Sequence, residues 1–173
     1  LQALHGLAQQ GPADAAPPGL AARRPVAGAG RAMRVLAAED NRTNRLVLSK
    51  MMAELDVELS FAEDGQAAVE VFGREGPDLV LMDISMPRMD GRAATRAIRQ
   101  LPGGAQVPII ALTAHATESD CADILECGVD GVMTKPLRKA QLHDLIARHA
   151  PPGTRPVAGA PALPPRRTAA ERG

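Results

Sequence analysis

Four short apolar runs in this chain each end in a polar or charged residue. Residues 79–82 are followed by Asp83, 35–38 by Glu39 and Asp40, 109–112 by Thr113, and 131–134 by Lys135 and Pro136. Short apolar runs of this kind are typical of strands buried in a parallel sheet. Because open α/β sheets carry their sites at the carboxyl ends of the strands, we expect three acids, a hydroxyl and an ammonium to meet at one edge.

Helical patterns alternate with these runs. Strands are expected at residues 34–38, 57–62, 79–82, 109–112 and 131–133. Helices are expected at about residues 43–55, after Asp64, from near Gly91, after Thr117 or Ser119, and over a last stretch that includes His149. Five βα units with right-handed crossovers predict an α/β fold, a doubly wound three-layer sandwich around a parallel sheet.

Composition limits the partners of this domain. Aromatic residues make up 1% of the chain, so the core must be aliphatic. The formal net charge is zero, but acidic side chains are in excess within residues 33–150 and basic ones in the ends. An acidic domain binds nucleic acid poorly, and no apolar run is long enough to span a bilayer. We therefore expect no direct contact with nucleic acid or membrane.

The two ends of the chain differ in composition from its middle. Residues 1–32 and 151–173 are rich in Ala, Pro, Gly and Arg, which predicts a disordered linker and a disordered tail around a domain at 33–150. A basic localisation or nucleic-acid patch is the less favoured interpretation. The chain begins with Leu rather than Met, so we expect it to be a piece of a longer protein.

The two cysteines fall in one predicted helix. Cys121 and Cys127 are too few and wrongly spaced for a zinc site, and a disulfide between them is not expected. A packing role is favoured, with Cys121, Ile124 and Leu125 on the buried face of the helix.

The loop after the first strand distinguishes nucleotide binding from metal binding. It reads Glu39-Asp40-Asn41-Arg42-Thr43 and lacks the glycines that let a backbone approach a pyrophosphate. Its adjacent carboxylates favour a hard divalent cation, and Mg²⁺ in particular. The alternative is that Asp40 only caps the first helix and Glu39 is solvated.

Asp83 has two candidate roles, as a third metal ligand and as a nucleophile that forms an acyl phosphate. A cation would stabilise the charge on the phosphoryl oxygens, Lys135 would pair with the same group, and Thr113 would donate a hydrogen bond to it. Taken singly, a threonine such as Thr113 is more often a helix-capping or strand-end hydroxyl, and a lysine such as Lys135 is most often a surface residue. The Lys135–Pro136 bond is a candidate cis peptide.

The loop after Asp83 is predicted to turn sharply into the third helix, because Pro87 and Gly91 bracket it. Asp90 is interpreted as the cap of that helix in preference to a member of the site. His115 either steers the water that hydrolyses an acyl phosphate or is a plain loop histidine, and the second interpretation is favoured.

Taken together, Glu39-Asp40, Asp83, Thr113 and Lys135-Pro136, with Met86-Pro87-x-Met89-Asp90-Gly91, resemble the receiver domain of two-component response regulators over residues 33–149. The resemblance implies a flavodoxin-like (βα)5 fold with strand order 2-1-3-4-5. It implies that Asp83 accepts a phosphoryl group from a histidine kinase or histidine phosphotransfer domain. It further implies Mg²⁺ held directly by Asp40 and Asp83, through water by Glu39, and by the backbone carbonyl of Ser85, with Thr113 and Lys135 on the phosphoryl oxygens.

The stretch Glu39-Asp40-Asn41-x-x-Asn44-Arg45 is similar to receivers at the C-terminus of hybrid sensor histidine kinases. That similarity implies a cytoplasmic domain, which in the full protein could be tethered to a membrane-bound kinase. The domain would catalyse only its own phosphorylation and dephosphorylation, and the full protein would be a protein-histidine kinase. One departure concerns signalling, because Val132 stands where the family usually has the aromatic residue that swings inward.

Two other functions remain open at this point. One is a protein-interaction module with the receiver fold that works without phosphorylation. The other is an aspartyl phosphatase of the haloacid-dehalogenase kind, which places a second Asp two residues after the nucleophile. Ser85 occupies that position here, which disfavours the phosphatase.

Overall fold

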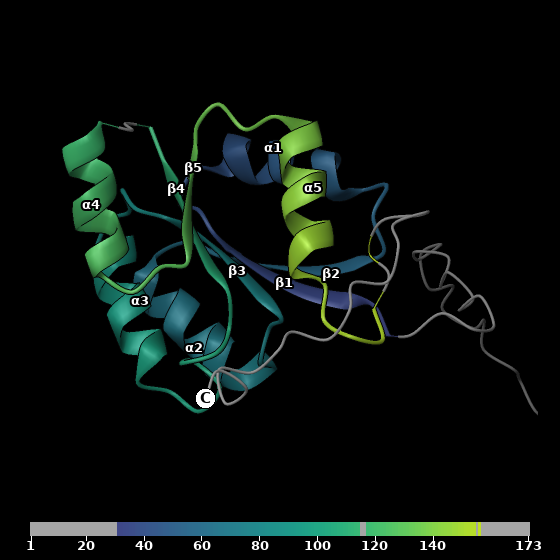
Figure 1. The fold of residues 1–173 in the computed structure, drawn as a ribbon, viewed down its shortest axis with the longest axis horizontal. Helices are drawn as coiled ribbons and strands as arrows, with labels where there is room; N and C mark the ends of the chain where they lie inside the picture. Colours follow the sequence, from purple (N-terminus) through teal and green to yellow (C-terminus); the bar gives the residue numbers. More distant parts are fainter. Residues whose placement is uncertain (1–30, 115–116, 155, 157–173) are drawn as a thin grey trace, which may run out of the picture.

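The apolar runs of the sequence form one parallel sheet. The computed structural model describes residues 31–114, 117–154 and 156. Its sheet has the order β2-β1-β3-β4-β5, with every neighbouring pair parallel (Figure 1). The strands are β1 (Met33–Ala38), β2 (Val57–Ala62), β3 (Leu79–Asp83), β4 (Ile109–Thr113) and β5 (Gly131–Thr134), and the helices within the described residues are α1 (Arg42–Met52), α2 (Gly65–Glu75), α3 (Gly91–Arg99), α4 (Glu118–Glu126) and α5 (Lys139–His149). The predicted flavodoxin-like (βα)5 sandwich is confirmed.

Successive strand residues point to opposite faces of the sheet, and this alternation produces two cores. Val35 and Ala37 of β1 pack in a cluster with α1 and α5. Leu36 and Ala38 of the same strand pack in a cluster with α2, α3 and α4 on the other face (Figure 1). Burial on both faces explains why β1, β3 and β4 read as continuous apolar runs.

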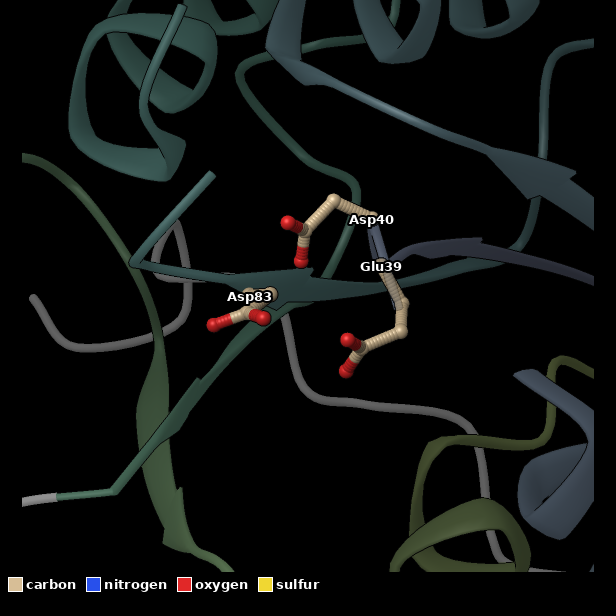
Figure 2. A group of neighbouring side chains, drawn as sticks. All are labelled: Glu39, Asp40 and Asp83. Carbon is tan, nitrogen blue, oxygen red and sulfur yellow. The ribbon is translucent and has the colours of Figure 1, made fainter. Parts of the chain in front are cut away.

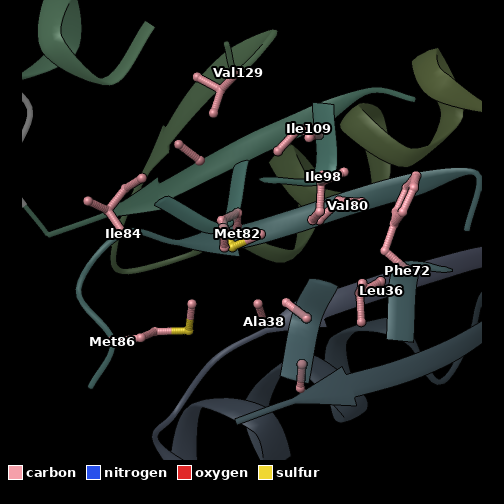
Figure 3. Packing of buried hydrophobic residues seen from close by; sticks show 14 of the residues in the cluster. Leu36, Ala38, Phe72, Val80, Met82, Ile84, Met86, Ile98, Ile109 and Val129 are labelled. Carbon is pink, nitrogen blue, oxygen red and sulfur yellow. The ribbon is translucent and has the colours of Figure 1, made fainter. Parts of the chain in front are cut away.

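The larger of these clusters is aliphatic except for one ring. Figure 3 shows Leu36, Val80 and Ile109 from three neighbouring strands beside Phe72 of α2 and Ile98 of α3. Burial of branched aliphatic side chains over the paired strands therefore stabilises this side of the core, as the low aromatic content predicts.

Polar side chains cap the first four helices. Asn41 accepts from the backbone N–H groups of Thr43 and Asn44, Asp64 from Ala67, Asp90 from Ala93, and Thr117 from Asp120. Each cap satisfies a donor that has no partner inside its helix. The predicted caps Asp64 and Asp90 are confirmed, and so is a start of α4 directly after Thr117. The alternative of Asp40 as a cap is wrong, because Asn41 holds that position.

Two details of the helices differ from expectation. Leu125 was expected on the buried face of α4 but is 49% exposed, while its neighbour Ile124 is buried. Consecutive helical residues point about 100° apart, and the face that α4 buries includes Ile124 but leaves Leu125 at its edge. The first helix ends at Met52, yet Leu55 beyond it is still buried. Both cysteines are free, and Cys127 is the buried one.

Contacts continue on both sides of the predicted 33–150 domain. The Arg31 guanidinium binds both carboxylate oxygens of Asp78 at 2.6 Å. The backbone N–H of Asp56 donates to the carbonyl of Pro156 at 2.9 Å. Asp56 and Asp78 each precede a strand, so both contacts lie at the amino-terminal edge of the sheet, opposite Asp83. Residues 1–30, 155 and 157–173 of the predicted linker and tail lie outside the described residues.

Among the described helices, none combines the length and apolar character needed to cross a membrane.

Candidate functional site

Three carboxylates meet at the carboxyl-terminal edge of the sheet. Glu39 and Asp40 follow β1, and Asp83 ends β3, the strand that pairs with β1. One oxygen from each lies within 4.8 Å of the others, and Figure 2 shows the three side chains gathered at these strand ends. Glu39 is 1% and Asp83 5% exposed, whereas Asp40 is exposed. The site therefore has two buried carboxylates and one carboxylate that is open to solvent.

Lys135 supplies the cation of this cluster. Its ammonium donates to Asp83 Oδ2 and to Glu39 Oε2, each at 2.7 Å. Its own backbone N–H donates to the carbonyl of Thr113 at 2.8 Å, which holds the end of β5 beside the end of β4. The peptide bond from Lys135 to Pro136 is cis. The convergence expected from strand ends far apart in the sequence is thus present.

One ammonium shared by two buried carboxylates shifts the pKa values of the site. Burial raises the pKa of Asp83, and the hydrogen bonds from Lys135 and from the Ser85 N–H only partly oppose this effect. Burial alone would lower the pKa of Lys135, but its hydrogen bonds to Asp83 and Glu39 together outweigh burial and raise it. Lys135 has two carboxylate partners, whereas Asp83 shares that one lysine with Glu39, which carries a like charge. The cluster therefore keeps an unbalanced negative charge.

The loop after Asp83 packs closely beneath that residue. The backbone N–H of Ser85 donates to Asp83 Oδ1 at 3.1 Å. A Cβ atom on Gly91 would lie 2.1 Å from the Asp83 carbonyl oxygen, so only glycine fits there. Arg88 adopts a left-handed backbone (φ 64°), and its guanidinium binds the buried Asp64 carboxylate. Hydrogen bonds to the backbone N–H of Ala67 and to Arg88 lower the pKa of Asp64.

The other predicted site residues fall in different places. Thr113 ends β4 and is buried, next in the sheet to the strand that ends in Asp83. Ser85 is exposed and lies two residues after the end of β3. Asp90 caps α3 and is not a member of the carboxylate cluster. His115 lies outside the described residues.

Two residues beside the carboxylates had no role assigned from the sequence. Asn44 donates to Glu39 Oε1 at 2.9 Å. Arg45 donates to the carbonyls of Glu39 and Asp40, also at 2.9 Å. Their spacing three and four residues after Asn41 puts both on the first turn of α1. The sequence signal for their role was this position at the helix start, a few residues after Glu39 and Asp40.

The donor set fits a hard divalent cation. All three clustered ligand atoms are carboxylate oxygens, which Mg²⁺ prefers, and they carry more negative charge than Lys135 neutralises. Neither a thiol nor an imidazole belongs to the cluster among the described residues, as a zinc site would require.

Comparison with known proteins identifies the family. Residues 35–147 match the response regulator receiver domain. The chain belongs to this family. The receiver is 40% identical to the sensor protein GacS of Pseudomonas syringae pv. syringae over 121 residues, and 37% identical to the histidine-protein kinase BarA of Escherichia coli K12 over 120 residues. These matches cover 68% and 69% of this chain but 13% of each relative.

Solved structures agree with this assignment. The receiver domain of the sensor histidine kinase PA1611 from Pseudomonas aeruginosa PAO1, which has magnesium in its active-site cleft, is 37% identical with a TM-score of 0.64, covering 67% of this chain and 95% of that one. Vibrio cholerae CheY4 is 25% identical, also with a TM-score of 0.64, covering 67% of this chain and 97% of that one. The predicted likeness to receivers of hybrid sensor kinases is therefore confirmed.

Proposed function

We propose that this receiver accepts a phosphoryl group on Asp83 from a phosphohistidine, within a two-component or phosphorelay system. The observation that carries the proposal is the ammonium of Lys135 at 2.7 Å from both Asp83 and Glu39. A nucleophilic carboxylate, an acidic metal cluster and a mobile cation at one sheet edge are the parts that phosphoryl transfer needs.

In the proposed transfer, an Asp83 oxygen bonds to phosphorus while the bond from phosphorus to the donor histidine nitrogen breaks, and the imidazole leaves. Lys135 moves from its two carboxylates onto a phosphoryl oxygen, and the Thr113 hydroxyl donates to another. Asp40 and Asp83 would hold Mg²⁺ directly, Glu39 through water, and Ser85 through its backbone carbonyl. Bound Mg²⁺ would offset the charge that builds on the phosphoryl oxygens.

We further propose that the donor is a histidine kinase or a histidine phosphotransfer domain that docks over α1. Leu46 and Val47 on α1 are 55% and 42% exposed. Val47 also lines a cavity of about 210 Å³ between α1 and the residues after β5, together with Glu39, Asn44, Leu48, Lys135, Pro136 and Leu137. An apolar surface next to the phosphoryl site suits a helical partner.

Signal output is proposed to differ from that of receivers with an aromatic switch. Val132 on β5 has no ring that could rotate inward. Any change on phosphorylation would pass through Thr113 and α4, or the domain would serve mainly as a phosphoryl relay. Since this receiver matches a small part of each sensor kinase named above, we propose that it is the receiver of such a kinase, on the cytoplasmic side.

Labelling tests this proposal directly. The purified chain is incubated with acetyl phosphate or a phosphorylated histidine phosphotransfer protein, with Mg²⁺ or with EDTA, and the acyl phosphate is followed on phosphate-affinity gels. Labelling that requires Mg²⁺ and disappears in Asp83→Asn supports the proposal. If the folded wild-type chain stays unlabelled by both donors, the proposal fails and the phosphorylation-independent interaction module becomes the better account.

A further inference from the structure

Arg45 binds the acidic loop from behind. One guanidinium nitrogen, Nη1, donates to the carbonyls of both Glu39 and Asp40 at 2.9 Å. The other, Nη2, donates to the Glu63 carboxylate at 2.8 Å. The backbone N–H of Arg45 also donates to the Asn41 carbonyl at 3.0 Å, within the first turn of α1. One largely buried side chain thus joins α1, the loop after β1 and the residue after β2.

Asn44 holds the carboxylate that Lys135 shares. Its amide donates to Glu39 Oε1 at 2.9 Å, and the Asn41 backbone N–H reaches the same oxygen at 3.2 Å. The other oxygen, Oε2, faces Lys135 at 2.7 Å. The two oxygens of Glu39 are therefore assigned to different neighbours, which leaves this buried side chain a single orientation.

We propose that Asn44 and Arg45 are positioning residues that hold the Glu39–Asp40 loop in its metal-binding conformation and thereby set the affinity for Mg²⁺. This inference rests on the metal site of the proposed function. Neither side chain belongs to the cluster of carboxylates that could hold the cation. Each acts through Glu39 or through the backbone that carries Glu39 and Asp40.

The physical argument concerns the cost of bringing carboxylates together. Glu39, Asp40 and Asp83 repel one another, so an unrestrained loop would let the exposed Asp40 swing into solvent. Arg45 opposes this by fixing both loop carbonyls and by adding a positive charge behind them. When Lys135 moves to a phosphoryl oxygen, Asn44 and the Asn41 N–H are the groups that still hold Glu39. Loss of such outer partners typically weakens metal binding about 10- to 100-fold.

The test compares Arg45→Lys and Asn44→Ala with Arg42→Lys. Arg42 is exposed on the same helix, so its lysine variant is the same substitution without the loop contacts. Lysine keeps the charge of Arg45 but cannot span two carbonyls and Glu63 together. Mg²⁺ affinity is measured by calorimetry on the unphosphorylated chain. Phosphorylation by acetyl phosphate is then followed across Mg²⁺ concentrations, and circular dichroism checks that each variant is folded.

We expect Arg45→Lys and Asn44→Ala to bind Mg²⁺ about 10-fold more weakly, with Arg42→Lys unchanged. Phosphorylation rates at saturating Mg²⁺ should stay near wild type. If wild type binds Mg²⁺ and is phosphorylated but the folded variants match it, the positioning role is refuted while the proposed function stands. If Arg42→Lys weakens binding as much as Arg45→Lys, the contacts of Arg45 are not the cause. A wild-type chain that binds no Mg²⁺ and stays unlabelled overturns both.

Discussion

Replacing Lys135 with methionine should destabilise the metal-free domain strongly. Methionine keeps much of the side-chain length but removes the charge, so Glu39 and Asp83 are left facing each other. Their oxygens lie within 4.8 Å, and two unit charges at that separation repel by about 3 kcal/mol at an effective dielectric constant of about 20. Removing one partner of a buried ion pair generally costs about 3–5 kcal/mol. We expect a loss of about 3 kcal/mol, because Asn44 and Ser85 still donate to the two acids.

Mg²⁺ should reverse much of this loss. A ligand at 100 times its dissociation constant adds about 2.7 kcal/mol to stability. The variant has a more negative site, so Mg²⁺ should bind it more tightly than wild type and stabilise it more. The variant should nevertheless be phosphorylated slowly, because it has no ammonium to bind a phosphoryl oxygen.

The direction of the Lys135 pKa shift decides the pH at which stability should be measured. The folded pKa of Lys135 is raised, because its bonds to Asp83 and Glu39 outweigh the opposing effect of burial. Its stabilising contribution is therefore complete below the unfolded pKa, about 10.4, and is lost as the pH rises through the folded value. Measurements near pH 7.5 capture the whole difference between wild type and Lys135→Met.

Urea unfolding in EDTA and in excess Mg²⁺ provides the assay. The chain has no Trp or Tyr, so far-UV circular dichroism is the appropriate signal. Lys139→Met is the matched control, because Lys139 pairs with an exposed Glu54 and such surface pairs contribute little to stability. Equal stability of Lys135→Met and Lys139→Met in EDTA, or equal stabilisation of both by Mg²⁺, would refute the electrostatic reasoning.

Three further predictions address neighbouring features. Burial raises the pKa of Asp83, so its ionisation costs stability as the pH rises above about 3.9. Asp83→Asn should therefore be more stable than wild type near pH 7 in EDTA. A variant that unfolds at lower urea concentration than wild type contradicts this. Gly91→Ala would bring a Cβ to 2.1 Å from the Asp83 carbonyl oxygen and should lower the free energy of unfolding by about 3 kcal/mol. An unchanged melting curve would show that the loop shifts to make room for the methyl group. Leu46→Asp should slow transfer from a histidine phosphotransfer protein but leave acetyl phosphate labelling intact, unlike the similarly exposed control Leu125→Asp, and equal effects of the two would exclude docking over α1.

The strands and most helix starts could be predicted from the sequence because they depend on neighbouring residues. An apolar run buried on both faces shows no alternation, and β1, β3 and β4 show none. Asp64 and Asp90 precede helical patterns and do cap α2 and α3. Leu125 was placed wrongly, because helical spacing gives the pattern of a face but not how much of it the sheet covers.

The candidate site was only partly predictable. Acids at the ends of two apolar runs indicated which residues would gather, and the resemblance to receivers gave their expected roles. The pattern could not say that Glu39, rather than Asp40, is the buried acid that shares Lys135 with Asp83. It also assigned nothing to Arg45, whose guanidinium contacts both the loop before its helix and Glu63, which lies 18 positions further along the chain.

The sequence by itself determined where strands and helices form and which polar groups close each strand, since these follow from residues a few positions apart. The tertiary structure alone decided how one lysine is divided between two acids, how Asn44 and Arg45 hold the acidic loop, and which apolar residues remain on the surface. Those outcomes depend on strand order and on side chains meeting across the fold from distant parts of the chain, and no local pattern encodes them.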